Sequence, residues 1–455
     1  MKFRKTSKDT KAVRNYMGAK SFEQSPKEEL TFAVISTFLE DSYYESKDSR
    51  IKRIEDLVEK VSKTDPEFVA TLAIVTRKEF YMRSAFHLLI GALAKFHKKD
   101  SLVSKTIVQG VERVDDLAEI VAYSGKPIPN QIKKGIARKL VDFGPYQLAK
   151  YKGIGKDISL VDLFNLVHPK PPEDKKEIWS KLLKGKLEAP DTWEVGLSSG
   201  KDKGKVWKDL VMSGKIGYMA LLRNLRNILK QADKETIDEA VRQISDRERV
   251  KKSKQLPFRF LSAYSALEES KTGGLTFEKE KGNYEPVKDA VRKALEYSVN
   301  NIPLLEGRTL ILSDNSGSMY GDRGGASPVS AMSQRKTADI ANLFALLYWL
   351  KADNTLVGLF GDKLITPKLD RTKNIFENFK IVNEEAEECG ESTEEGIFDI
   401  FKDLIKEKKM VDRIVIFSDG QVGDGCEWYD RHSNQGGDFN KLFQKYKAIN
   451  PNVIV

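Results

Sequence analysis

The chain has 455 residues, 40% of them hydrophobic and 9% aromatic, which is typical of two or three folded domains and excludes a disordered protein. It has no run of about 18 apolar residues, so we expect no membrane span, and its first residues lack the apolar stretch of a signal peptide. Cys389 and Cys426 are too few for a disulfide framework or a cysteine zinc site, which favours a reducing, cytoplasmic location.

The net charge of +10 is divided unevenly along the chain. Residues 1–300 hold 58 Lys and Arg against 43 Asp and Glu, whereas residues 301–455 hold 19 against 24. A basic first part joined to an acidic last part indicates that the first part meets a polyanion. A basic surface that only confers solubility explains the composition equally well.

Apolar side chains recur every three or four residues through the first 300 residues, which predicts helix after helix. No segment there alternates cleanly enough to predict a strand. Successive helix pairs without exact sequence repetition favour a HEAT-like solenoid, with a compact irregular bundle as the alternative. The predicted helices cover residues 26–41, 51–61, 66–80, 83–99, 115–124, 130–143, 218–232 and 235–245.

The pattern changes near residue 300, where short β-branched runs begin to alternate with helical stretches. This alternation predicts a parallel sheet covered by helices on both faces. We therefore expect an all-α domain over residues 1–300 and an α/β domain over residues 301–455. The predicted strands are 309–313, 355–360, 413–418 and 452–455, and the predicted helices are 333–352, 393–408 and 438–449.

Oxygen-bearing side chains follow the first of these strands, in the stretch "LILSDNSGSM". Asp314, Ser316 and Ser318 lie there, Asp419 follows a later strand, and Thr393 stands just before a helix. Ligands of open α/β sheets bind at the carboxyl ends of the strands. Two carboxylates with several hydroxyls suit Mg²⁺ or a similar hard cation, and the lack of His and Cys argues against zinc. The alternative is an Asx-turn whose serines only cap the next helix.

The same stretch lacks the features of known catalytic motifs. It is not the G-x-S-x-G of a hydrolase elbow, it lacks the second aspartate of a phosphoryl-accepting motif, and the chain has no P-loop. We expect no catalytic residue, and a metal-dependent hydrolase is the minority alternative.

The order Asp-x-Ser-x-Ser, Thr, Asp resembles the metal-ion-dependent adhesion site of von Willebrand factor A domains, over about residues 305–455. The resemblance implies a Rossmann-like α/β domain. A complete A domain has a further strand and helix after the run that here ends at Val455. We therefore expect the domain to lack its last strand and helix.

Three other stretches, residues 145–172, 191–228 and 253–264, look like the TROVE module of the Ro autoantigen family, found in bacterial and phage relatives. The most specific elements are "TWE", "WKDL" and "MALLRNLRN". This resemblance implies a ring of HEAT-like helices closed by the A domain. It also implies Y-like structured RNA on a basic outer face and single-stranded RNA ends in the ring. Relatives act in RNA quality control or processing with an exoribonuclease, and we expect a monomer in the RNA complex.

Cationic residues suited to phosphates cluster around a Gly-containing loop and a helix end, in the region where the family places RNA contacts. The alternative for the histidine among them is a capping or core role. The candidates are Lys150, Lys152, Lys156, His168 and Lys170.

Two further segments carry candidate RNA contacts. Loop 198–209 can hold phosphates with its lysines and amides, or it is only a solvated turn, and we expect Trp193 and Trp207 to be core residues. Arg223 and Arg226 lie three apart on one helical face, where they can bind RNA or pair with acids of the next repeat. A non-catalytic RNA-binding protein is the leading hypothesis, and a metal-site scaffold that binds a protein partner is the alternative.

Overall fold

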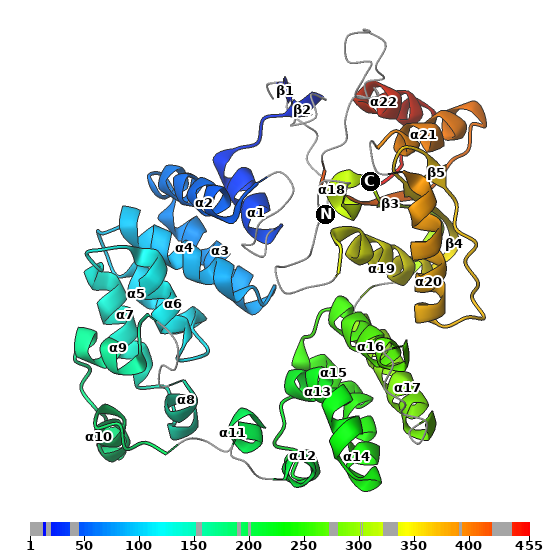
Figure 1. Ribbon diagram of the computed structural model, residues 1–455. Coiled ribbons are helices and arrows are strands. Elements are labelled where there is room, and N and C mark those ends of the chain that lie inside the picture. Colours follow the sequence, from blue (N-terminus) through cyan, green and yellow to red (C-terminus); the bar gives the residue numbers. More distant parts are fainter. Residues whose placement is uncertain are drawn as a thin grey trace. The chain divides into compact units, whose positions relative to one another are not determined.

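The structure is a computed structural model of the 455-residue chain (Figure 1). It describes residues 12–14, 20–36, 45–151, 157–188, 193–198, 202–272, 281–300, 302, 304–321, 335–390, 394–420 and 439–455. The chain divides into two compact units, Gln24–Val195 and a second made of Met1–Glu23 together with Gly196–Val455. No helix in the described part is long and apolar enough to cross a membrane.

The unit Gln24–Val195 is a stack of helices in two alternating layers. From α4 to α7, and again for α9, each helix packs on the helix two places before it along the chain, which is the packing expected of a helical solenoid. One layer contains α2 (Lys47–Ser62), α4 (Arg83–Phe96) and α6 (Asp116–Ser124). The other contains α3 (Pro66–Lys78), α5 (Leu102–Gly110), α7 (Asn130–Leu140) and α9 (Leu160–Val167). The remaining helices of this part are α1 (Pro26–Ile35), α8 (Pro145–Lys150), the 3₁₀ turn η1 (Glu173–Lys175) and α10 (Lys176–Leu183), and α11 (Trp193–Ser198) crosses its end at Val195.

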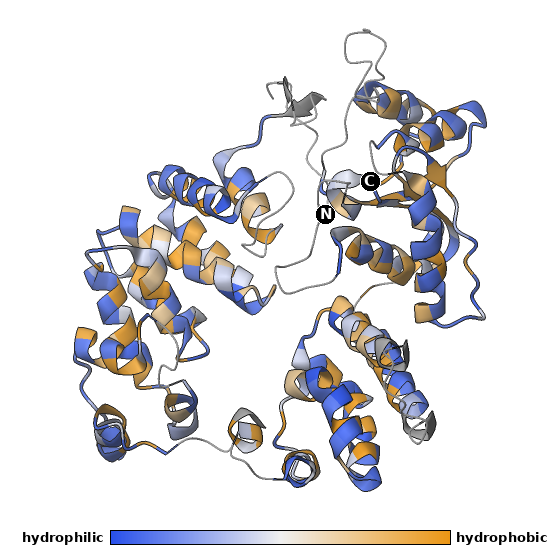
Figure 2. Cartoon of the chain, viewed as in Figure 1, coloured by the Kyte–Doolittle hydropathy of each residue, from blue (hydrophilic) through white to orange (hydrophobic). Residues whose placement is uncertain are grey.

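Side-chain caps fix where several of these helices begin. Ser25 and Glu28 form a capping box at α1, and Asp65 accepts a hydrogen bond from the Phe68 amide at α3. Helix α4 lies at the centre of the stack, since every residue from 85 to 94 is buried. Figure 2 shows the contrast between α4 and the largely hydrophilic α2, which has only one buried side.

Gly91 allows α4 and α6 to approach each other closely. A Cβ atom at this position would lie 2.6 Å from the Cβ of Tyr123 and 2.8 Å from its carbonyl carbon. Real Cβ atoms do not tolerate such distances, so the helix contact requires glycine here.

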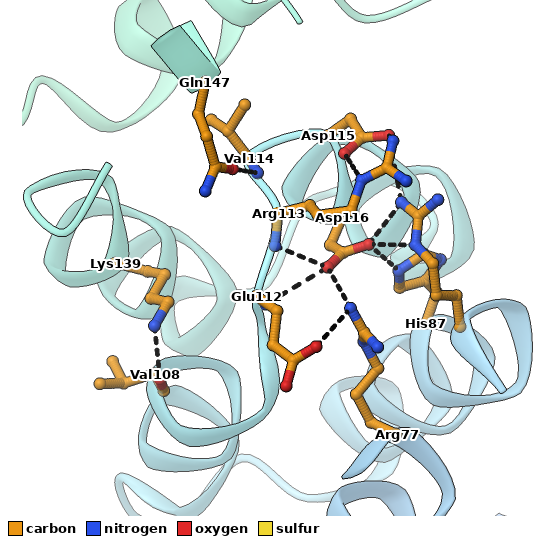
Figure 3. A network of polar contacts seen from close by, with 11 residues as sticks. Arg77, His87, Val108, Glu112, Arg113, Val114, Asp115, Asp116, Lys139 and Gln147 are labelled. Atoms are coloured by element: carbon orange, nitrogen blue, oxygen red, sulfur yellow. Dashed lines mark hydrogen bonds and ion pairs between the residues drawn. The ribbon is translucent and has the colours of Figure 1, made fainter. Parts of the chain in front are cut away.

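A buried carboxylate joins α3, α4 and the start of α6 (Figure 3). Asp116 is fully buried and accepts hydrogen bonds from Arg83 Nε at 2.7 Å, His87 Nε2 at 3.0 Å and the Arg113 amide at 3.1 Å. Arg77 Nη2 lies 3.4 Å from the same carboxylate, and the Arg77 side chain is also buried. Groups from two helices and from the segment before α6 thus satisfy a charge that would otherwise be costly to bury.

The second unit combines a group of helices with the sheet. Trp207 is fully buried and donates from Nε1 to Gln231 Oε1 at 2.9 Å, which confirms the predicted core role. Residues 203–209, which we predicted as a loop, are helical instead, because Asp202 caps a helix whose apolar face is buried. The helices are α12 (Lys203–Met212), α13 (Tyr218–Gln231), α14 (Lys234–Ile244), α15 (Arg247–Ser253), α16 (Pro257–Thr272) and α17 (Lys281–Ser298).

A four-stranded sheet follows, in the order β5-β4-β3-β6. The strands β3 (Leu305–Asp314), β4 (Ala352–Phe360) and β6 (Arg413–Phe417) are parallel, as the alternating pattern predicted. Leu310 and Leu312 pack in one apolar cluster with two of the helices, α21 and α22, while α19 packs on β3 and β4. The helices are α18 (Gly317–Tyr320), α19 (Thr337–Leu350), α20 (Ile375–Ala386), the 3₁₀ turn η2 (Glu387–Cys389), α21 (Gly396–Lys406) and α22 (Phe439–Ile449).

Three strand expectations need correction. The first 300 residues do contain strands, β1 (Ala12–Arg14) and β2 (Lys20–Phe22), which pair antiparallel. The run 452–455 makes only a single parallel bridge, between Arg413 and Ile454. An unpredicted short strand, β5 (Leu364–Ile365), turns back antiparallel on β4.

The helices of the second unit contact its α/β part directly. Tyr264 of α16 stacks on Phe376 of α20, with ring centroids 3.8 Å apart and an interplanar angle of 18°. Helix α16 also packs against α19. The compact units therefore divide near residue 195, and the change from helices to strands near residue 300 lies inside one of them.

Candidate functional site

A cluster of oxygen atoms lies where β3 and β6 end side by side. Asp314 is the last residue of β3, and its Oδ1 accepts a hydrogen bond from the Ser316 amide at 2.9 Å. Its Oδ2 accepts from Ser418 Oγ at 2.6 Å, and Ser418 directly follows β6. The hydroxyls of Ser316 and Ser318 lie 3.5 Å apart. The parallel register places these groups together, because Ser313 pairs with Phe417.

Burial controls the charge of this cluster. Asp314 is only 2% exposed, and burial raises its pKa to about 6, against hydrogen bonds from Ser316 and Ser418 that lower it. The nearby charge of Asp419 raises this pKa further. A divalent cation would compensate two neighbouring carboxylates, so the donor set fits Mg²⁺. Thr393, the remaining predicted ligand, lies outside the described residues.

The alternative of an Asx-turn with capping serines is met in part, since Asp314 accepts the Ser316 amide in an Asx-turn, but it does not account for the Ser316 hydroxyl. This residue is the N-cap of α18, but its side chain makes no capping hydrogen bond, so its hydroxyl is not used to start the helix. In the described ranges, no three or more His, Cys, Asp or Glu side chains form a metal-binding group. A cation at this edge would therefore depend on hydroxyl oxygens as well as on carboxylates.

Cationic residues lie at the ends of two helices in the unit Gln24–Val195. Lys150 ends α8, with its Nζ 5.7 Å from the ring centroids of both Tyr146 and Tyr151. The Arg113 guanidinium lies 4.6 Å from the same Tyr151 ring, a neighbour that sequence reasoning missed. Lys152 and Lys156 lie outside the described part of the chain.

His168 ends α9 in a left-handed backbone conformation, with φ 44° and ψ 57°. Its amide donates a hydrogen bond to the Phe164 carbonyl at 2.9 Å. The backbone therefore closes the helix, and the imidazole is not needed as a cap. The side chain is exposed, which excludes the core role, and Lys170 is exposed two residues later. Proline at position 169 restricts the segment between them.

Arg223 and Arg226 are exposed on α13, in the other compact unit. Within the described ranges neither forms a salt bridge, so the predicted alternative of pairing with acids of the next repeat is not seen there. Arg259 of α16 lies near Arg223, and partial burial together with the charge of Arg223 lowers the pKa of Arg259. Sequence reasoning missed Arg259, since the packing of α13 on α16 brings it there.

A model of the TROVE domain matches residues 30–185 and 179–302, more than half of the chain. The chain belongs to the TROVE-domain family. Proteins of the TROVE/Ro family are generally RNA-binding. The resemblance inferred from the sequence stretches is thereby confirmed.

Curated relatives of this TROVE chain share only part of it. Telomerase protein component 1 of Mus musculus is 32% identical over 152 residues, which are 32% of this chain and 6% of that protein. Telomerase protein component 1 of Rattus norvegicus is 37% identical over 111 residues, 24% of this chain and 4% of that protein. The similarity thus spans a small fraction of these longer relatives.

One solved structure is similar to the TROVE chain over nearly its whole length. The crystal structure of the Deinococcus radiodurans Ro (RSR) protein matches with a TM-score of 0.61 at 15% sequence identity. The match covers 94% of this chain and 91% of the Ro chain. The two proteins therefore share a fold, which agrees with the sequence expectation of helical repeats followed by an A domain.

Proposed function

We propose that this TROVE chain is a non-catalytic RNA-binding protein that binds small structured RNA of the Y-like class. The observation that carries the proposal is the exposed His168 at the end of α9, with Lys170 beside it, in a chain of a generally RNA-binding family. Lys150 contributes a second lysine, at the end of α8. Cations at helix ends can contact phosphates without being buried.

A second part of the proposal concerns single-stranded RNA. Arg223 and Arg226 present two guanidinium groups on one face of α13, and guanidinium groups bind phosphate in a fork-like geometry. We assign them to single-stranded RNA ends, in the ring that the family resemblance implies. Binding of both RNA forms suits a role in RNA quality control or processing, with an exoribonuclease as partner.

A filter-binding assay of a structured RNA over a salt series tests this function. Lys170→Ala should weaken binding and flatten the logarithmic salt dependence by about one unit, because one phosphate contact is lost. The control is Lys181→Ala, since Lys181 is exposed but pairs with Glu177 at 2.6 Å. If the two variants have equal affinities and equal salt dependence, the RNA site lies elsewhere on the chain. If binding by the wild type does not depend on salt, the proposed RNA-binding function is wrong.

The oxygen cluster at Asp314 favours a second function, metal-dependent docking of a protein partner. We propose that Asp314, Ser316, Ser318, Thr393 and Asp419 hold Mg²⁺, which would offer a positive charge to a partner carboxylate. Calorimetry should show Mg²⁺ uptake by the wild type and none by Asp314→Ala, whose RNA affinity should stay unchanged. Equal uptake by both proteins, or none by either, would contradict this proposal.

A further inference from the structure

A pocket of about 510 Å³ lies between the end of α9 and helix α10. Its apolar wall includes Phe164, Trp179 and Leu183. Phe164 and Trp179 are buried and packed edge to face, with ring centroids 4.8 Å apart and an interplanar angle of 88°. Two buried aromatic rings in contact form a fixed wall rather than an adaptable one. The volume lies in the range of sites that enclose small organic molecules.

The mouth of this pocket is polar and cationic. Asn165 and Ser180 supply hydrogen-bonding groups, and His168, Lys176 and Lys184 also line the pocket. Lys176 pairs with Glu173 at 2.6 Å, whereas Lys184 forms no ion pair among the residues that the structure describes. The site therefore combines an aromatic wall, a few polar groups and an available positive charge.

Each of these features matches one part of a nucleotide. A planar base suits the aromatic and apolar wall, its polar edge suits Asn165 and Ser180, and its phosphate suits Lys184. A free phosphate would leave the apolar wall without a partner, and a purely apolar ligand would leave the polar groups without one. A base stacked in a duplex cannot enter, because its faces and its edge are already occupied.

We propose that this pocket takes one unpaired nucleobase of the bound RNA. The proposal rests on the RNA-binding function above and adds the feature of the RNA that is recognised. His168 and Lys184 contact the backbone, while the base leaves its stack and packs against the exposed Leu183, on a wall held in place by the buried Phe164 and Trp179. RNA with an unpaired base is then preferred over a continuous duplex of the same length and charge.

The test uses the full chain and two hairpin RNAs of equal length, each closed by a non-nucleotide linker in place of loop bases, that carry 2-aminopurine at one position of the stem. In one hairpin the probe base is unpaired, and in the other it is paired. We expect the wild type to bind the unpaired hairpin about tenfold more tightly, as expected for one stacked base. Its fluorescence should change on binding, and that of the paired hairpin should not.

The variant that separates the pocket from the rest of the surface is Leu183→Trp. Leu183 is 46% exposed, so a larger side chain can fill the pocket without disturbing the core. This variant should lose the tenfold preference while keeping the affinity for the paired hairpin. The matched control is Lys181→Trp, which adds the same ring to α10 at a residue that does not line the pocket.

The outcomes distinguish this inference from the proposed function. Equal binding of both hairpins by the wild type, or an undiminished preference in Leu183→Trp, would overturn the pocket while leaving RNA binding intact. Failure of the wild type to bind either hairpin would overturn both the pocket and the proposed RNA-binding function. Loss of preference in Lys181→Trp as well as in Leu183→Trp would show that the pocket is not the cause.

Discussion

Asp116 is a carboxylate that stays charged although water does not reach it. Burial alone would raise its pKa, but the hydrogen bond from His87 and the charge of Arg83 outweigh burial and hold the pKa well below 3.8. Arg77 adds a further buried cation at 3.4 Å. The Asp116 side chain therefore holds α3, α4 and α6 together, and this contact depends on its negative charge.

Replacing Asp116 with Asn should lower the free energy of unfolding by about 3–5 kcal/mol, because buried cations lose their counter-charge. Urea unfolding followed by circular dichroism measures the change. The control is Asp142→Asn, since Asp142 is 51% exposed and forms only a surface pair with Lys139. That variant should change stability by less than about 1 kcal/mol. Similar effects of the two variants would show that the Asp116 network contributes little.

The same group predicts a pH dependence. Because folding lowers the pKa of Asp116 from 3.8, its contribution is complete well above pH 3.8 and is lost as the pH falls toward the folded-state pKa. The stability difference between wild type and Asp116→Asn should be constant from about pH 5 to 7 and shrink below about pH 4. A difference that grew on acidification would contradict the assigned direction.

At the scale of helices and strands, local patterns predicted elements whose apolar residues recur regularly, such as α4 and β3. They failed for β1 and β2, which are three residues long and therefore show no period. They failed also for α12, where Gly204 and three lysines suggest a loop although Val206 and Leu210 are buried. Local sequence cannot weigh burial that other helices supply.

The candidate sites also contain residues that the sequence predicted and residues that only the structure shows. Asp314, Ser316 and Ser318 are close in the sequence, so a single motif predicted them. Asp419 was predicted because it follows a later strand at the same edge of the sheet. Ser418 was missed, although it immediately precedes Asp419, because its hydrogen bond to Asp314 exists only once β6 pairs with β3. The α9–α10 pocket likewise exists only after two helices have packed.

The contact between α4 and α6 gives a prediction at this scale. Gly91→Ala should destabilise the protein by about 1–3 kcal/mol, because the added methyl group overlaps Tyr123 and forces the helices apart. Gly144→Ala is the control, since a Cβ at Gly144 meets no atom within 4 Å. Thermal unfolding of both variants makes the comparison, and equal melting temperatures would mean that α4 and α6 can move apart without cost.

At the scale of the whole molecule, the compact units do not coincide with the change from helices to strands. Tyr264 and Phe376 stack across that change, and Lys288 lies 5.5 Å from the centre of the Tyr264 ring. Helix α16 thus shares a packed surface with the α/β part, and α17 packs on α16. Unfolding of α16 should therefore destabilise the α/β part, and unfolding of the α/β part should destabilise α16.

Tyr264→Ala tests this coupling in the full chain. Removal of one stacked ring should cost about 1 kcal/mol and speed hydrogen exchange in both α16 and α20. Helix α4, in the other compact unit, is the internal control and should exchange at its wild-type rate. Faster exchange confined to α16 would show that the helices and the sheet are stabilised independently.

The left-handed backbone of His168 implies that stability and activity are opposed at one position. A residue with a Cβ atom pays about 1 kcal/mol to adopt φ 44°, whereas glycine does so without strain. His168→Gly should therefore raise the melting temperature while it weakens RNA binding. A search for more stable variants that ignored RNA would select glycine here and weaken RNA binding, whereas selection for binding would keep the strained histidine.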